Sequence, residues 1–200
     1  LEHIAFGTVN GADGKPFKTR AGGVMNLKSL IDLAVDKAFE NIPEQIDAAL
    51  AQKQAHQIAI GALKYQDLKN VRTSDYFFDT ENFTKSEGRT GAYIQYAIAR
   101  INSILEKSGQ TETAVQGASL HLSHPMERDV LLTLKREPEA LEAAYLRREP
   151  SVISEYVYEL AQKFSTFYGA VSINNEPDEA LKLSRLKLIR MTRDTLKNNL

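Results

Sequence analysis

Apolar residues in the second half of the chain recur at helical spacing, and this pattern limits the possible fold more than any other feature. It predicts consecutive helices over about residues 90–107, 125–135, 137–147, 151–168 and 178–197. Pro125 suits a first helical turn, because its missing N–H would have no partner there. The polar segment 108–123 is the best candidate for a mobile loop. Short helices joined this closely favour an antiparallel helical bundle.

The first part of the chain predicts a small α/β unit. Residues 3–9 alternate like a short strand, and turn-forming residues with a proline follow over 10–16, so a loop leaves the strand. One helical stripe runs from Leu27 to Ile42, with Asn26 placed to cap it and Pro43 to end it. We expect a second helix over 46–63 and an ordered connection over 65–83. The fold is therefore predicted to be mainly α, with the α/β part over 1–84 and the bundle over 85–200.

Composition and charge narrow the function classes. The net charge is -1, with acids and bases in both halves, so any contact with RNA must be local. The absence of cysteine excludes disulfides, thiolate zinc sites and cysteine nucleophiles, and fits a cytoplasmic location without requiring it. No apolar run reaches the roughly 18 to 20 residues of a membrane span. The chain begins at Leu1 inside the strand-like pattern, so we expect a fragment of a longer, monomeric protein.

Residues 14–23 place three cations among three glycines on the loop after the first predicted strand. Glycine lets backbone N–H groups approach a ligand, and lysine or arginine supplies charge for phosphoryl oxygens, so a polyphosphate is the natural guest. From the residue types alone, a solvated basic turn is the favoured alternative.

The residues around this loop resemble arginyl-tRNA synthetases. His3 to Gly7 followed by Lys15-Pro16-Phe17-Lys18-Thr19 is similar to the loop that this family carries in place of the KMSKS motif of class I synthetases. The central Met and Ser are replaced by Pro16 and Phe17. The resemblance implies that Lys18 is the catalytic lysine, which stabilises the ATP triphosphate while arginine attacks the α-phosphate. It also implies that Lys15 and Thr19 help to bind ATP, with Mg²⁺ as its companion.

Two further blocks extend the resemblance over most of the chain. Residues 64–68, 72–79 and 87–100 are similar to the run after that loop, although the family's usual proline near Gly91-Ala92 is missing. Residues 128–168 resemble the DALR-type anticodon-binding domain. The resemblance implies a remnant of a Rossmann-type catalytic domain followed by that bundle, with arginine and its tRNA as partners. No HIGH-like motif is found, so we expect that this chain does not aminoacylate alone.

The helix expected over 90–107 carries two faces. An apolar stripe is formed by Ile94, Ile98, Ile101 and Leu105. A second stripe, about 130° away, holds Tyr93, Tyr96 and Arg100, and two aromatic rings with an arginine suit unstacked RNA bases. From residue types alone, packing of the tyrosines on a neighbouring helix is favoured. The resemblance implies tRNA contacts at Tyr93, Tyr96 and Tyr156.

The remaining charged residues carry weaker signals. Cations gather in the last predicted helix, at Lys182, Arg185, Lys187, Arg190, Arg193 and Lys197. We expect them to form a solvated face, and contact with the RNA backbone is the alternative. His121 and His124, with Glu127 and Asp129 nearby, form a weak ligand set, so we expect no structural metal.

Three functions remain open at this point. The resemblance favours part of an arginine–tRNA ligase. The alternatives are a non-catalytic helical RNA-binding module and, more distantly, a helical protein-interaction domain. The loop at 14–23 discriminates against both alternatives, because neither needs a lysine that binds a triphosphate.

Overall fold

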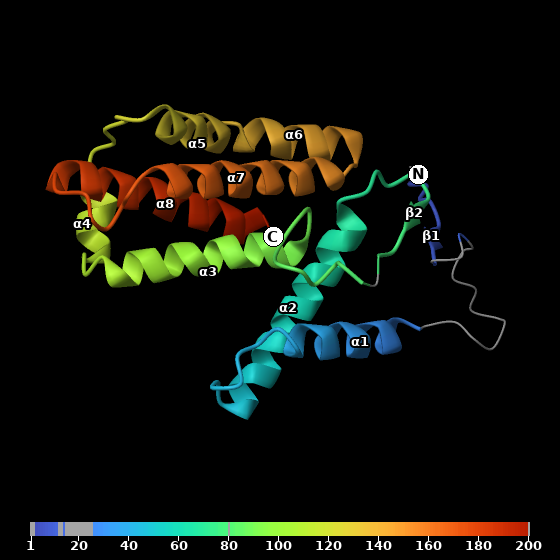
Figure 1. Ribbon diagram of the computed structural model, residues 1–200. Coiled ribbons are helices and arrows are strands. Elements are labelled where there is room, and N and C mark those ends of the chain that lie inside the picture. The colour runs from blue at the N-terminus through green and yellow to red at the C-terminus, as the bar shows by residue number, and fades with distance from the viewer. Residues whose placement is uncertain (1–2, 12–13, 15–25, 80, 200) are drawn as a thin grey trace.

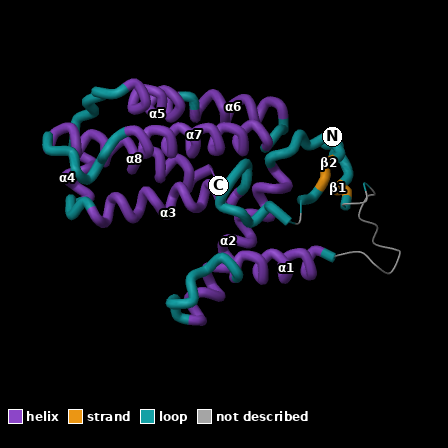
Figure 2. Tube along the Cα trace, in the orientation of Figure 1, coloured by secondary structure: helices purple, strands orange, loops and turns teal. Residues whose placement is uncertain are grey.

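The computed structural model describes residues 3–11, 14, 26–79 and 81–199. Its elements follow one another as β1 (Val9–Asn10), α1 (Leu27–Phe39), α2 (Ala48–Leu68), β2 (Tyr76–Phe77), α3 (Gly91–Lys107), α4 (Glu112–Gly117), α5 (Pro125–Lys135), α6 (Glu137–Arg147), α7 (Ser151–Ala170) and α8 (Glu179–Asn199) (Figure 1). Helices dominate the trace, as Figure 2 shows, so the expected mainly α fold is confirmed.

The second half of the chain is a helical bundle. α5 and α6 lie along α7, while α8 contacts α3, α5 and α7 (Figure 1). The apolar stripe expected on α3 faces this core: Ile94 and Ile101 are buried, and Ile98 packs against them. Large side chains from the other helices complete the core, among them Leu160, Phe164, Phe167, Leu186 and Ile189. Burying each such side chain contributes about 1.5 to 3 kcal/mol, which holds the bundle together.

Local signals in the sequence set where the helices begin. Asn26 caps α1, as expected, because its side-chain oxygen accepts a hydrogen bond of 2.9 Å from the N–H of Ser29. Thr90 caps α3 in the same way, accepting from the N–H of Tyr93 at 3.1 Å. Pro125 occupies the first turn of α5, as expected. Of these three helices, α3 lines the candidate site described below.

α2 joins the bundle to the α/β part. Ala55, Ala59 and Ala62 on α2 lie in a second core with α1 and Phe83, whereas Tyr65, near the end of α2, lies in the bundle core. β1 and β2 pair in parallel, Val9 opposite Tyr76 and Asn10 opposite Phe77. Within the described residues, no helix is both long and apolar enough to cross a membrane.

Three expectations about element bounds were wrong. The strand expected over 3–9 is only β1, because the N–H of Gly7 bonds to Arg72 O and the N–H of Thr8 to the Asp75 side chain, outside any strand ladder. The helix expected over 46–63 continues to Leu68, because its last turn packs into the bundle core. The loop expected over 108–123 contains α4, whose Val115 is buried in the bundle core.

Gly91 lies where α3 crosses α2. A β-carbon at this position would stand 2.6 Å from the carbonyl oxygen of Gly61 and 2.9 Å from the β-carbon of Tyr65. We expect Gly91→Ala to lower the free energy of unfolding by about 1 to 3 kcal/mol, because backbone atoms must move apart. Gly117→Ala on α4 is the control, since a β-carbon there meets no atom within 4 Å. Urea unfolding followed by circular dichroism measures both, and equal midpoints would contradict the expectation.

Candidate nucleic-acid interface

A groove of about 860 Å³ lies between the second half of α3 and the segment that leads from α7 to α8. Tyr96, Arg100 and Lys107 of α3 line one side, and Tyr168 of α7 and Asn174 of the α7–α8 connection line the other. Two cations and no carboxylate are among the residues that line it. The groove therefore carries local positive charge in a chain whose net charge is -1.

Arg100 lies between two aromatic rings at the groove. Its guanidinium carbon is 4.6 Å from the centroid of the Tyr96 ring and 5.2 Å from that of Tyr168. Arg100 also donates a hydrogen bond to the Tyr96 hydroxyl. Tyr96 is 45% exposed and Tyr168 39% exposed, so both rings offer surface to a ligand. Exposed rings combined with a cation are suited to stacking on unpaired bases.

Tyr93 does not join this cluster. Its hydroxyl donates a hydrogen bond of 3.0 Å to Ser165 Oγ, and its ring centroid lies 5.7 Å from that of Tyr158. Both partners belong to α7, so Tyr93 packs between α3 and α7. Residue types alone favour packing of both tyrosines on a neighbouring helix. The structure shows this packing for Tyr93 but not for Tyr96.

Tyr156 lies in the core of the bundle. It is 3% exposed, its hydroxyl donates to the carbonyl oxygen of Leu134 at 3.5 Å, and burial raises the pKa of its phenol. A ring in this position cannot reach an RNA base unless the bundle opens. The expected tRNA contact at Tyr156 stays a prediction, and its burial argues against it.

Sequence reasoning missed part of the groove. Tyr168 could have been found, because it stands four residues after the core residue Phe164 and stacks on it at a centroid distance of 6.0 Å. Asn174 carries no such signal, since its place depends on how the α7–α8 connection folds. Its Nδ2 donates to the carbonyl oxygen of Ile104 at 3.2 Å, while its buried Oδ1 has no partner among the described residues. Asn174 Oδ1 is thus a hydrogen-bond acceptor in the groove wall that receives no hydrogen bond from the described residues.

The cations of α8 are mostly bound within the protein. Arg185 is buried against Glu127, Lys187 Nζ donates to the carbonyl oxygen of Ala118 at 2.6 Å, and Arg190 pairs with Glu112 at 3.2 Å. Arg193 pairs with the adjacent Asp194. The expectation of a solvated basic face was therefore wrong for Arg185, which is buried, whereas Lys187, Arg190 and Arg193 bond within the chain and remain partly exposed.

Other expected site residues lie elsewhere or outside the described part. The ATP-loop residues Lys15, Lys18 and Thr19 lie outside the described residues. His124 caps α5, since its Nδ1 accepts from the N–H of Met126 at 3.3 Å, and the backbone N–H of His121 donates to Ser184 Oγ at 2.7 Å. Within the described residues, no group of three or more histidine, aspartate or glutamate side chains could hold a metal ion.

Comparison with known protein families assigns both parts of the chain. Residues 1–80 match the family model described as tRNA synthetases class I (R), catalytic domain. Residues 94–200 match the DALR anticodon binding domain, and the chain belongs to this family. The two matches lie on either side of the boundary expected at residue 84, which stays a prediction.

Curated relatives and solved structures agree with this family. The chain is 43% identical to arginine–tRNA ligase of Pasteurella multocida and 44% identical to that of Haemophilus influenzae, over its full length and over 36% and 35% of those proteins. Thermus thermophilus arginyl-tRNA synthetase superposes with a TM-score of 0.85 at 28% identity, over 99% of this chain and 33% of that one. The chain thus spans about a third of the relatives it matches, and its resemblance to arginyl-tRNA synthetases is confirmed.

Proposed function

We propose that this chain is part of an arginine–tRNA ligase and that its groove binds the anticodon loop of arginine tRNA. The ligase would activate arginine with ATP and Mg²⁺ and transfer it to that tRNA, with Lys18 as catalytic residue and Lys15 and Thr19 at the ATP. The observation that carries the RNA part is the cluster of Arg100 with the exposed Tyr96 and Tyr168 rings. The cytoplasmic location and monomeric state expected from the sequence belong to the same proposal.

The chemistry of the groove supports a single-stranded RNA ligand. Aromatic faces stack on any base that has left its helix, and the fixed plane of an arginine stacks or bonds in the same way. Lys107 at the end of α3 supplies a second cation for the phosphate backbone. A non-catalytic RNA-binding module would share these features, but it does not explain why residues 1–80 match a catalytic domain.

Tyr96→Ala is expected to weaken binding of an RNA hairpin with an arginine anticodon loop by about 5- to 150-fold. The range corresponds to about 1 to 3 kcal/mol for each lost base stack. Folding should be little affected, because the Tyr96 ring is 45% exposed. Filter binding at several salt concentrations measures the change, and the affinity of the parent chain should fall as salt rises.

Tyr145→Ala is the matched control for this experiment. Tyr145 is also an exposed tyrosine on a helix, and an arginine carbon, that of Arg148, likewise lies 4.6 Å from its ring centroid. It lies on α6, away from the groove, so its replacement should leave RNA affinity unchanged. Equal affinity of the folded Tyr96→Ala chain and the parent would reject the groove as the RNA site.

A further inference from the structure

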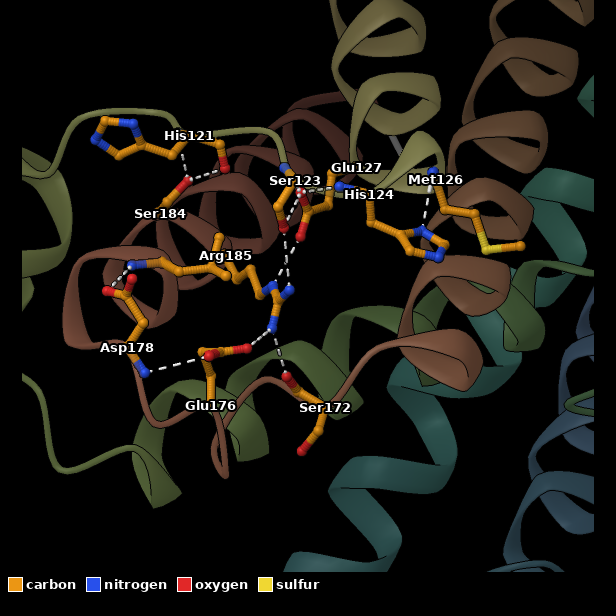
Figure 3. A network of polar contacts seen from close by, with 11 residues as sticks. His121, Ser123, His124, Met126, Glu127, Ser172, Glu176, Asp178, Ser184 and Arg185 are labelled. Carbon is orange, nitrogen blue, oxygen red and sulfur yellow. Dashed lines mark hydrogen bonds and ion pairs between the residues drawn. The ribbon is translucent and has the colours of Figure 1, made fainter.

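Arg185 of α8 lies at the centre of a buried network that joins three parts of the bundle. The residue is only 7% exposed. Figure 3 shows its guanidinium group between Ser123 and Glu127 on one side and Ser172 and Glu176 on the other. All of these partners come from outside α8, so one side chain connects separate elements.

The α5 side of the network is rigidly held. Arg185 Nε donates to Glu127 Oε1 at 2.7 Å, and Glu127 is fully buried. The other carboxylate oxygen of Glu127 accepts from the backbone N–H groups of Ser123 and His124, at 2.6 and 3.0 Å. These bonds form part of the cap of α5. Arg185 is therefore anchored to a fixed point of the bundle.

The other side of the network holds the groove wall. Arg185 Nη1 donates to the carbonyl oxygen of Ser172 at 3.0 Å and also to the Glu176 carboxylate. Ser172 and residues 173–175, which lie between these two attachment points, line the groove. Asn174 is bonded in turn to the carbonyl oxygen of Ile104 on α3. The wall is thus fixed to α8 at its ends and to α3 in its middle.

We propose that Arg185 is a positioning residue for the RNA groove: it holds the α7–α8 connection at the distance from α3 that a stacked base requires. This inference rests on the function proposed above. Arginine suits the task because its planar group presents several donors in fixed directions, whereas a lysine offers one compact charge. The arrangement also neutralises Glu176, a carboxylate next to a groove meant for phosphates.

Glu176→Ala tests this role, because it removes a wall-side contact and leaves the pair between Arg185 and Glu127 intact. Loss of a negative charge near the groove should by itself tighten RNA binding. A positioning role predicts the opposite: binding weaker by about 2- to 30-fold, the range for residues that act on a site without touching its ligand. Amide hydrogen exchange of residues 172–176 should become faster, while that of α3 stays unchanged.

Glu176→Gln provides the rescue. Its amide oxygen can still accept from Arg185, so RNA affinity and exchange should stay near those of the parent chain. Glu112→Ala is the matched control, since it removes the pair with Arg190, also on α8 but away from the groove. It should leave both measurements unchanged.

The outcomes separate the two proposals. If Tyr96→Ala weakens binding but Glu176→Ala binds RNA as well as the parent or better, the ion pair of Arg185 with Glu176 does not position the groove and the inference falls, while the proposed function stands. If both variants bind like the parent, the groove does not bind RNA and both proposals fall. Weaker binding by Glu176→Ala, with rescue by glutamine and faster exchange, supports the positioning role.

Discussion

Glu127→Ala is expected to lower the free energy of unfolding of the chain by about 3 to 5 kcal/mol, the usual cost of breaking a buried ion pair from one side. Glu127 is 0% exposed and bonds both to Arg185 and to the backbone at the start of α5. Its removal leaves the buried guanidinium with one carboxylate fewer and takes away half of the capping box. Urea unfolding at neutral pH, followed by circular dichroism, measures the loss.

Glu159→Ala is the control for burial. Glu159 forms two hydrogen bonds with Arg136, at 2.8 and 3.0 Å, and this pair is partly exposed, with side-chain exposures of 32% and 52%. An exposed pair contributes only about 0 to 1 kcal/mol, because water screens the charges. Similar losses for Glu127→Ala and Glu159→Ala would contradict the importance of the buried network.

The difference between parent and Glu127→Ala should also depend on pH. Burial by itself would raise the pKa of Glu127, but the hydrogen bond from Arg185 and those from the backbone N–H groups outweigh it and hold the pKa below its ordinary value of 4.5. A carboxylate whose pKa is lower in the folded state stabilises fully above its unfolded pKa and loses that effect as the pH falls towards the folded value. The two chains should therefore converge in stability below about pH 4.5. A constant difference down to strong acid would contradict this.

Lys18→Ala is expected to slow adenylate formation by about 100- to 1,000-fold in the whole ligase that we propose. The basis is the resemblance of Lys15 to Thr19 to the KMSKS-type loop, which aims a cation at charge that develops on the triphosphate. Loss of one such preorganised group costs about that factor in rate. Affinity for arginine should change little, since the interaction belongs to the transition state. ATP–pyrophosphate exchange with tRNA present measures the rate.

Lys28→Ala is the control for this prediction, because Lys28 is an exposed lysine of α1 only ten positions further along the chain. It should leave the exchange rate unchanged. Exchange at the parent rate in Lys18→Ala would remove Lys18 from the catalytic residues. A rise in the arginine KM with an unchanged rate would assign it to substrate binding instead.

The sequence by itself determined the long helices of the bundle and the family, but not the short α4. The starts of α1, α3 and α5 follow from Asn26, Thr90 and Pro125, since caps and first-turn residues act over three or four positions of the chain. The apolar stripe of α3 likewise reports its own buried face, because helical periodicity is local. Resemblance to the synthetases needed only residue identities. The predicted end of α2, at residue 63, was wrong, because the last turn of this helix is stabilised by packing in the bundle core.

Only the tertiary structure decided which polar residues line the groove and which are buried in the bundle. Tyr93 and Tyr96 are equivalent in the sequence, yet Tyr93 meets Ser165 of α7 while Tyr96 opens into the groove. In the sequence, Arg185 resembles one cation of a solvated face. In the structure it is buried and pairs with Glu176 and with Glu127, which is 58 positions away. The physical reason is range: periodicity and capping depend on neighbours within a few positions, whereas burial and pairing depend on which distant segments the fold brings together.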